Sequence, residues 1–314
     1  MFDESLCLVV VGSQAANAAD RTLARSEIQS VQAIRNDGTV THCRFFDDVG
    51  AFGVASLCLD VAARRLYYSG GTDLCSLDLS SGIKTDLGVP GLIDVHEMEL
   101  IDGKIYVGNT GSDELVIFDP ASGEVTRQHI TGAGSPDADR HHLNQVMRAA
   151  DGELYGLVHH VDGKQVLRQM AARALKSQGN GGVIRLSDGK RFPLRLHAPH
   201  TVTVVDGNNW VFDSAQAYIR IFDPNWNAAG AIPTAGWGRG AALLSGGERT
   251  LYAVGLSNIR RRYLHLFKNP EAFVNGVELI DVNTQKQVYK RELAQIEQVN
   301  NVYFYPAELL SVIA

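Results

Sequence analysis

The stretch IFDPASG, residues 117–123, decides the fold because its pattern returns along the chain. Each time, two or three apolar-biased residues lead into a polar turn made of Asp, Asn, Ser, Pro or Gly, the composition of a tight hairpin turn. The pattern occurs at residues 33–38, 77–82, 117–123, 184–189, 221–226 and 279–284. Each copy predicts a β-strand that enters a tight turn.

Two further strand-like segments precede each copy. Segments such as IYVGNTG (105–111) and LYAVGLS (251–257) are rich in β-branched and aromatic residues and end in small polar ones. Segments such as VHEMELI (95–101) come before these. The irregular period, roughly 40–65 residues, is typical of four-stranded propeller blades. The sequence therefore predicts an all-β, six-bladed β-propeller.

The two ends of the chain are expected to share one blade. The N-terminal segment supplies second, third and fourth strands at about 6–12, 29–35 and 40–46, but no first strand. The C-terminal segment supplies a first strand at about 299–305 and little after it. Pairing these strands would close the ring and remove its open edges.

Length and pattern predict a single domain over residues 1–314 with two insertions. Helix-like segments at about 161–182 and 259–275 interrupt the repeat, each between the second and third strands of its blade. Closed β architectures commonly run to this length as one domain.

Composition limits the classes of partner. The net charge is −6, and the basic run Arg260–Arg262 is local, so the sequence indicates neither nucleic-acid nor anionic-membrane binding. The four cysteines show no CxxC pairing or metal-ligand spacing, which predicts free thiols.

The segment LCLVVVG near the N-terminus is preceded by acidic residues, unlike a signal peptide, and no apolar run approaches the ~18 residues of a membrane span. We expect a cytoplasmic protein.

A propeller would gather distant polar residues at one mouth of its axis. All innermost strands point the same way, so their starting residues form one ring, and the ends of the second strands lie at the same face. The inner ring is drawn from Ala55, Ser56, His96, Glu97, His142, Asn144, His200, Arg239, Asn300 and Asn301. The second ring adds Ser13, Ser69, Asn109, His159, His160, Asp213, Ser257 and, nearby, Arg260.

This ring suggests one of two chemistries. One divalent metal ion is a hypothesis for His96, Glu97, His142 and His200, because imidazole suits zinc, iron, copper or nickel. Without a metal, His142 or His200 would serve as general acid or base, and Arg239 would bind a carboxylate, phosphate or sulfate through its planar fork. Expected substrate contacts are Asn144, His159, Asp213, Asn301 and Arg260.

The sequence leaves open the role of the single histidines and which member of each histidine pair faces the axis. Propeller axes are commonly polar and water-filled, so single histidines there could simply satisfy backbone groups. Sequence does not decide whether His141 or His142 faces the axis, nor which of His159 and His160 does. The glycines of GWGRG (236–240) open no helix, so they do not form a dinucleotide loop and are expected to give Arg239 room.

Five segments resemble the signatures of an uncharacterised β-propeller family, a domain of unknown function. They are DVHEMEL (94–100), HHLNQVM (141–147), PHTVTVVDGNNWVFDS (199–214), GWGRGAALL followed by VGLS (236–257) and GVELIDVNT (276–284). The resemblance covers about residues 90–305 and implies a propeller, but it brings no established activity and no catalytic residues. The insertion at 161–182 departs from the family pattern and is expected to cover the mouth as a lid.

Together these observations predict an enzyme that acts on a small, anionic molecule in an axial pocket. The chemistry would be metal-assisted or histidine acid/base catalysis, in a hydrolase, lyase or isomerase. The alternative is a propeller that binds a ligand or a protein without catalysis. Oligomeric state is not predicted.

Overall fold

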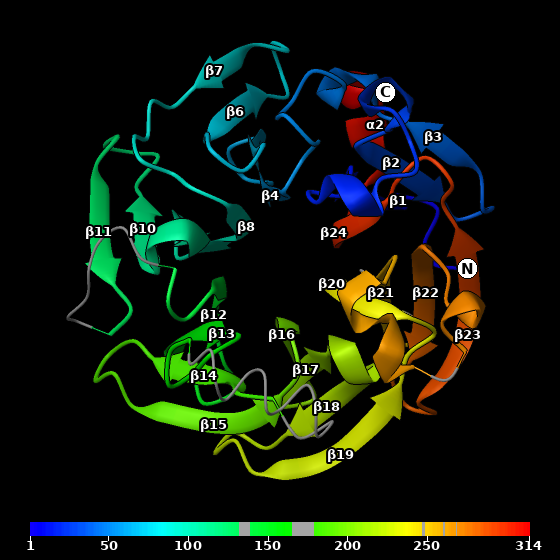
Figure 1. Ribbon diagram of the computed structural model, residues 1–314. Helices are drawn as coiled ribbons and strands as arrows, with labels where there is room; N and C mark the ends of the chain where they lie inside the picture. Colours follow the sequence, from blue (N-terminus) through cyan, green and yellow to red (C-terminus); the bar gives the residue numbers. More distant parts are fainter. Residues whose placement is uncertain (132–138, 165–178, 247–248, 260, 268) are drawn as a thin grey trace. The chain divides into compact units, whose positions relative to one another are not determined.

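The protein is a six-bladed β-propeller, as the sequence predicts. The computed structural model describes residues 1–131, 139–164, 179–246, 249–259, 261–267 and 269–314 (Figure 1). Within these residues, the strands form six sheets of four, each a blade. The chain divides into two compact units with three blades each, which are described separately: unit 1 comprises residues 1–90, 235–264 and 269–314, and unit 2 comprises residues 91–234 and 265–268. The expectation of a single domain remains a prediction.

Unit 1 contains the blade made from both chain ends and the blades on either side of it in sequence. The composite blade has the order β24 (Gln298–Pro306), β1 (Leu6–Ser13), β2 (Val31–Arg35) and β3 (Val40–His42). The next has β4 (Ser56–Asp60), β5 (Arg65–Ser69), β6 (Cys75–Asp78) and β7 (Lys84–Asp86). The third has β20 (Trp237–Leu244), β21 (Leu251–Ser257), β22 (Gly276–Asp281) and β23 (Lys286–Glu292).

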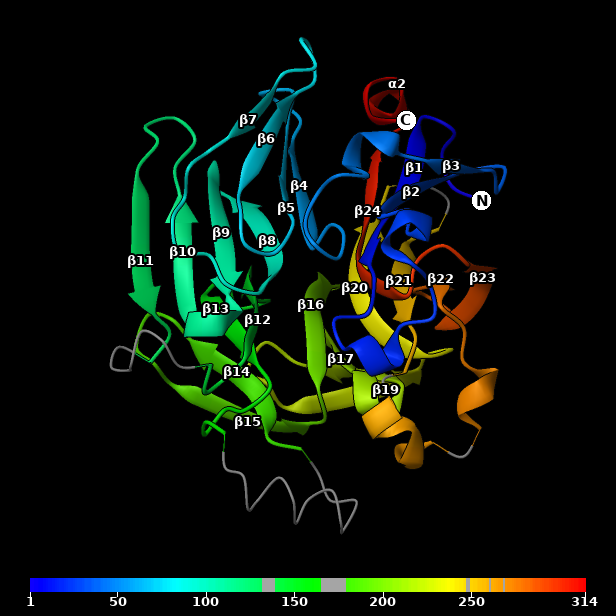
Figure 2. The same ribbon diagram turned by 45° about the horizontal axis from the view of Figure 1, so that its top comes forward.

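Unit 2 holds the other blades. Their strands are β8 (Val95–Ile101), β9 (Lys104–Asn109), β10 (Glu114–Phe118) and β11 (Val125–His129); β12 (Leu143–Arg148), β13 (Leu154–Val158), β14 (Gly181–Arg185) and β15 (Arg191–Leu196); and β16 (Pro199–Val205), β17 (Asn208–Asp213), β18 (Tyr218–Phe222) and β19 (Ala228–Pro233). The first strand β12 contacts the first strands β8 and β16 (Figure 2).

The predicted closure is confirmed by the pairing of β24 with β1. The two strands run antiparallel from Leu6 opposite Pro306 to Ser13 opposite Gln298, with one bulge at Val11 and Gly12. Strand β1 also pairs with β2 on its other edge, so neither of its edges is open. The C-terminal strand thus supplies the missing first strand of the N-terminal blade (Figure 1).

The near-continuous apolar run of β1 follows from burial on both of its faces. Cys7, Val9 and Val11 belong to one hydrophobic cluster, whereas Leu8 and Val10 belong to another. Alternate residues of a strand point to opposite faces, so a blade packed on both sides needs apolar residues at every position. Each such side chain contributes about 1.5–3 kcal/mol when it is fully buried.

The repeated polar motifs form the turns between third and fourth strands. The Asp119 carboxylate accepts a hydrogen bond from the backbone N–H of Ala121 in the IFDPASG copy. Likewise, the carboxylates of Asp78 and Asp223 accept hydrogen bonds from the backbone N–H groups two residues later, those of Ser80 and Asn225. These short-range bonds explain why Asp recurs where each hairpin turns.

The helical segments among the described residues are short. The 3₁₀ helices are Ala18–Asp20, Arg25–Glu27, Arg44–Phe46, Thr110–Ser112, Ser214–Gln216, Arg261–Leu266, Pro270–Ala272 and Ala307–Leu309, and α2 spans Leu310–Ile313. Two of them lie between β21 and β22, inside the segment 259–275. The insertion predicted at 161–182, with its role as a lid, falls largely at 165–178, outside the described residues. In the part of the chain that is described, no helix has the length and apolar character needed to cross a bilayer.

Candidate functional site

Polar residues at the ends of second strands hold the segments that enter the first strands of unit 2. Asp213, at the end of β17, accepts a 2.8 Å hydrogen bond from the backbone N–H of His197 and contacts Arg220. Asn109, at the end of β9, accepts one of 2.6 Å from the N–H of Ile93. Burial raises the pKa of Asp213, while its bond to His197 acts in the opposite direction. Both side chains therefore fix the approach to a first strand, and the predicted substrate contact of Asp213 remains a prediction.

Four imidazoles of unit 2 form a continuous row, here named the histidine row: His96, His142, His159 and His200. The ring centroids of His96 and His142 are 5.3 Å apart, those of His142 and His159 are 4.6 Å apart, and those of His159 and His200 are 5.3 Å apart. The rings come from the start of β8, the residue before β12, the residue after β13 and the start of β16. The structure thus brings together four histidines that span about a hundred residues of sequence.

His142 is held by a carboxylate. Its Nδ1 lies 3.2 Å from Oδ2 of Asp139, and the ammonium of Lys164 donates to the same oxygen at 2.5 Å. Burial alone raises the pKa of Asp139, but the hydrogen bonds from His142 and Lys164 outweigh this effect and hold the value at about 2. Asp139 is therefore ionised at neutral pH, and a carboxylate can only accept hydrogen bonds.

His159 is a neutral imidazole in the middle of the row. Burial lowers its pKa well below 6.5, and the neighbouring His142 and His200 lower it further. Its Nε2 lies 3.1 Å from the carbonyl oxygen of Pro199. Since a carbonyl can only accept, Nε2 carries the proton and Nδ1 carries the lone pair.

Asn144 shares the same carbonyl. Its side-chain N–H donates to Pro199 at 2.7 Å, and the side chain is almost completely buried. Its Oδ1 has no hydrogen-bond partner among the described residues. A buried amide oxygen without a donor is costly, so it marks a position where a bound donor would be favoured.

His200 and Glu97 are buried at the start of β16 and on β8 respectively. Nδ1 of His200 lies 2.9 Å from the hydroxyl of Ser214. The hydroxyl of Thr201 donates to Glu97 at 2.8 Å. These contacts orient both predicted residues, and they tie β8 to β16 beside the row.

The members of the two histidine pairs have different contacts, although the ring centroids of His159 and His160 are 6.2 Å apart. His142 and His159 belong to the row, whereas Nδ1 of His141 faces the carbonyl oxygen of His160 at 2.7 Å. Burial lowers the pKa of His160 to about 4 and also lowers that of His141. His141 is thus engaged with the backbone beside the row.

The row does not have the arrangement of a metal centre. No group of three or more His, Cys, Asp or Glu side chains in the described ranges is placed to hold a metal ion. In each of His142, His159 and His200, one ring nitrogen faces a partner, which is Asp139, Pro199 and Ser214 respectively. His96, Glu97, His142 and His200 form no such group as they lie, and the divalent metal ion predicted for them remains a prediction that metal analysis of the purified protein tests.

Two of the predicted residues belong to unit 1. Arg239 lies on β20 and is buried, and the amide oxygen of Asn301 on β24 accepts a hydrogen bond from its neighbour Val302. The glycine after Arg239 lets β20 approach β24 closely, because a Cβ at Gly240 would lie 2.3 Å from the Asn301 Cα. Arg260 is outside the described residues. The chemistry predicted for Arg239, Asn301 and Arg260 remains a prediction.

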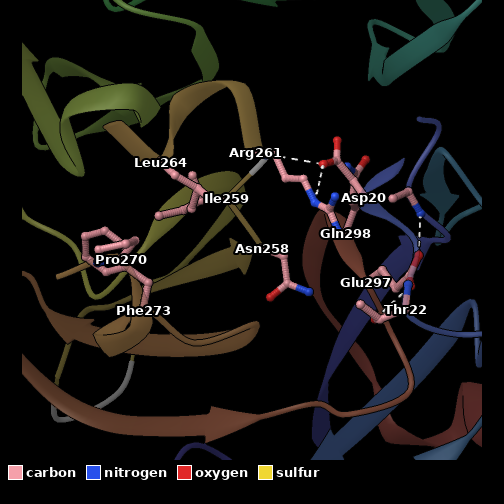
Figure 3. A pocket seen from close by; sticks show the side chains of 11 residues that line it. Asp20, Thr22, Asn258, Ile259, Arg261, Leu264, Pro270, Phe273, Glu297 and Gln298 are labelled. Atoms are coloured by element: carbon pink, nitrogen blue, oxygen red, sulfur yellow. Dashed lines mark hydrogen bonds and ion pairs between the residues drawn. The ribbon is translucent and has the colours of Figure 1, made fainter. Parts of the chain in front are cut away.

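Unit 1 also contains a cavity of about 250 Å³. Figure 3 shows its apolar wall, built from Ile259, Leu264, Pro270 and Phe273, and the amide of Asn258 opposite. The remaining lining residues are Ala15, Asp20, Thr22, Arg261, Glu297 and Gln298. The cavity lies after the end of β21 and at the start of β24, and no sequence motif pointed to it.

Comparisons with known proteins establish the fold. No family model and no curated protein matches the chain. A Bacteroides caccae protein of unknown function has a similar structure at 12% identity, with 96% of this chain and 98% of that chain covered and a TM-score of 0.61. Virginiamycin B lyase from Staphylococcus aureus is similar at 11% identity, over 96% and 95% of the two chains, with a TM-score of 0.52. The calcium-binding protein regucalcin from Agrobacterium tumefaciens is similar at 15% identity, over 80% and 77%, with a TM-score of 0.52.

Sequence reasoning missed the acidic partners of the row. Asp139 precedes His142 by three residues, and Asp94, whose carboxylate lies 3.4 Å from Nε2 of His96, precedes that histidine by two. An acidic residue shortly before a histidine at the start of a first strand was the available signal. It was ambiguous because surface loops are also rich in Asp.

Proposed function

We propose that the protein is an enzyme that moves a proton to or from a small-molecule substrate at the histidine row, with His142 as the acid/base residue. The observation that carries the proposal is the central place of His142 between the rings of His96 and His159. General acid/base catalysis needs an imidazole that is oriented and within reach of the substrate. The reaction would be a hydrolysis, elimination or isomerisation.

The environment of the row supports this chemistry. His142 keeps about a fifth of its side chain exposed, so a substrate can reach it, while most of the ring is shielded from water. His159 stays neutral at pH 7, so it adds no positive charge next to His142. The likeness to virginiamycin B lyase supports the fold alone. That the substrate is anionic is a further part of the proposal, based on Arg239, and Arg239→Lys would test it.

The test is a substrate panel followed by proton NMR in D₂O. Small hydroxy acids, their lactones and esters, and sugar acids are incubated with the native protein, and both consumption and deuterium exchange at carbon are recorded. We expect at least one compound to react and His142→Gln to lower its rate by about 10²–10⁴-fold. His265→Gln, which changes an exposed histidine, is the matched control. Equal rates in the native protein and His142→Gln, or no reaction with any compound, would contradict the proposal.

The cavity of unit 1 favours ligand binding without catalysis as the second candidate. Its volume of about 250 Å³ suits a small molecule, and its wall is part apolar and part polar, as in many binding sites. Under this alternative, a compound from the panel would raise the melting temperature equally in the native protein and in His142→Gln. Phe273→Ala would abolish that shift.

A further inference from the structure

Asp139 and His142 are each held in place by the backbone around them. The backbone N–H groups of Arg140 and His141 both donate to Oδ2 of Asp113 at 2.7 Å, which fixes the segment between the two residues. His142 has a positive φ of 58°, and its carbonyl accepts the N–H of His159 at 3.2 Å. A non-glycine residue in this conformation is strained and persists where its surroundings fix it.

The contact between them has one chemically consistent assignment. Oδ2 of Asp139 accepts from Lys164 and faces Nδ1 of His142. A carboxylate offers no proton, so the hydrogen lies on Nδ1 of the imidazole. When the ring is neutral, its lone pair is then on Nε2, and the ring itself makes contact with His96 and His159.

From this geometry we propose that Asp139 is a positioning residue that fixes His142 in the Nδ1–H tautomer, so that Nε2 begins the reaction as a base. The inference rests on the proposed function and deepens it. In the step, Nε2 takes the proton of a substrate O–H or acidic C–H, and the bonding electron pair stays on that oxygen or carbon. The imidazolium that forms is stabilised by the Asp139 carboxylate.

The same logic defines the substrate class. His142 offers a lone pair at Nε2, His159 offers one at Nδ1, and the Asn144 amide oxygen is an acceptor without a donor. An unprotonated Nε2 takes a proton from a donor, so the reacting part of the substrate is a group that carries an O–H or an acidic C–H.

The experiment measures the tautomer directly and needs no substrate. The full chain is labelled with ¹⁵N-histidine, and the His142 signals are assigned by their loss in His142→Gln. In the native protein, Nδ1 should have the shift of a protonated nitrogen and Nε2 that of an unprotonated one. Asp139→Ala should shift the population to Nε2–H, the form that free histidine favours. Asp139→Asn, whose amide both donates and accepts, should give a mixture and is the second variant if the first does not fold.

Two controls separate positioning from general structural support. Lys164→Met removes the ion pair but keeps the carboxylate, so the His142 tautomer should be unchanged. Asp47→Ala removes the carboxylate that lies 2.7 Å from Nε2 of His42 in unit 1, and it should affect the signals of that histidine only. An Nε2–H tautomer in the native protein, or an unchanged tautomer in both Asp139 variants, would overturn the inference.

The tautomer and the turnover are measured separately. If Asp139→Ala changes the tautomer but His142→Gln keeps full turnover, Asp139 still positions His142, and the proposed function together with the base role of Nε2 fails. For a compound that the native protein turns over, Asp139→Ala should lower kcat about 10- to 1000-fold with a smaller change in KM, and Lys164→Met should lower it less.

Discussion

At the scale of single residues, Asn144 beside the histidine row has an incomplete set of hydrogen bonds. Asn144 donates to Pro199 but has an amide oxygen without a partner among the described residues. By contrast, Asn209 on β17 accepts from the N–H of Ala150 and donates to the carbonyl of Asp223. Two buried asparagines in one unit therefore differ in how fully the fold uses them.

This difference predicts opposite effects of the same substitution. Asn144→Ala loses one hydrogen bond but also removes an unsatisfied oxygen, so the free energy of unfolding should change by less than about 1 kcal/mol, while reaction at the row is impaired. Asn209→Ala loses two satisfied bonds and leaves buried groups unpaired, which should cost about 2–3 kcal/mol. Urea unfolding of both variants measures this. Equal destabilisation would mean that Asn144 serves the fold alone.

At the scale of secondary-structure elements, β20 and β24 of unit 1 approach each other through Gly240. Its φ is +71°, and a Cβ there would lie 2.3 Å from the Asn301 Cα. Gly246, just after β20, has a φ of +104°, and a Cβ placed there would meet nothing within 4 Å. The two glycines share a conformation that disfavours side chains, but only one is in a close backbone contact.

Gly240→Ala should therefore destabilise the protein much more than Gly246→Ala. Both variants pay the cost of a left-handed backbone, about 1 kcal/mol. Gly240→Ala must in addition push β20 away from β24, which should bring the total above roughly 3 kcal/mol or leave the protein insoluble. Thermal unfolding of both variants is the measurement. Equal losses in the two variants would show that β20 moves freely.

At the scale of the whole molecule, the composite blade makes the two chain ends interdependent. Removing residues 298–314 deletes β24, exposes the edge of β1 and takes Val299 and Val302 out of a hydrophobic cluster. We expect insoluble or molten material. Removing residues 307–314 leaves β24 in place and should give a soluble, less stable protein. A cooperative unfolding transition for the larger deletion would contradict closure by β24.

Stability as a function of pH reflects two sets of buried groups that act in opposite directions. The pKa values of His141, His159 and His160 are lowered, so the unfolded chain binds more protons than the folded one below about pH 6.5, and stability is lost as the pH falls. Burial raises the pKa values of Glu99 and Glu278 to about 7, so the stability that these protonated carboxyls contribute is lost as the pH rises from 4.5 through 7.

Removing the titratable carboxyl of Glu278 should make the loss of stability at falling pH, which the histidines cause, steeper. Glu278→Gln keeps an oxygen for the N–H of Ala235, which donates to Glu278 at 3.2 Å, but no longer titrates. Between pH 7 and pH 5, the variant should lose roughly 1–2 kcal/mol more stability than the native protein. Chemical denaturation at both pH values is the measurement. Parallel losses would mean that Glu278 is ionised in the fold.

The sequence by itself determined the blades, because strands and hairpin turns are local. The near-continuous apolar run of β1 and the Asp residues of the turns are readable over a few residues, and the missing first strand of the N-terminal blade pointed to β24. His96, His142 and His200 were also singled out from their positions at strand starts. These inferences needed only short-range spacing.

Only the tertiary structure decided which side chains meet. The choice of His142 over His141 depends on a positive φ at His142, and the choice of His159 follows from its bond to Pro199, a residue 40 positions away. The role of Asp139 depends on Asp113, which fixes its neighbours from another blade. Such contacts join residues distant in sequence, and side-chain direction within a pair of adjacent histidines is set by backbone geometry, which residue types alone do not specify.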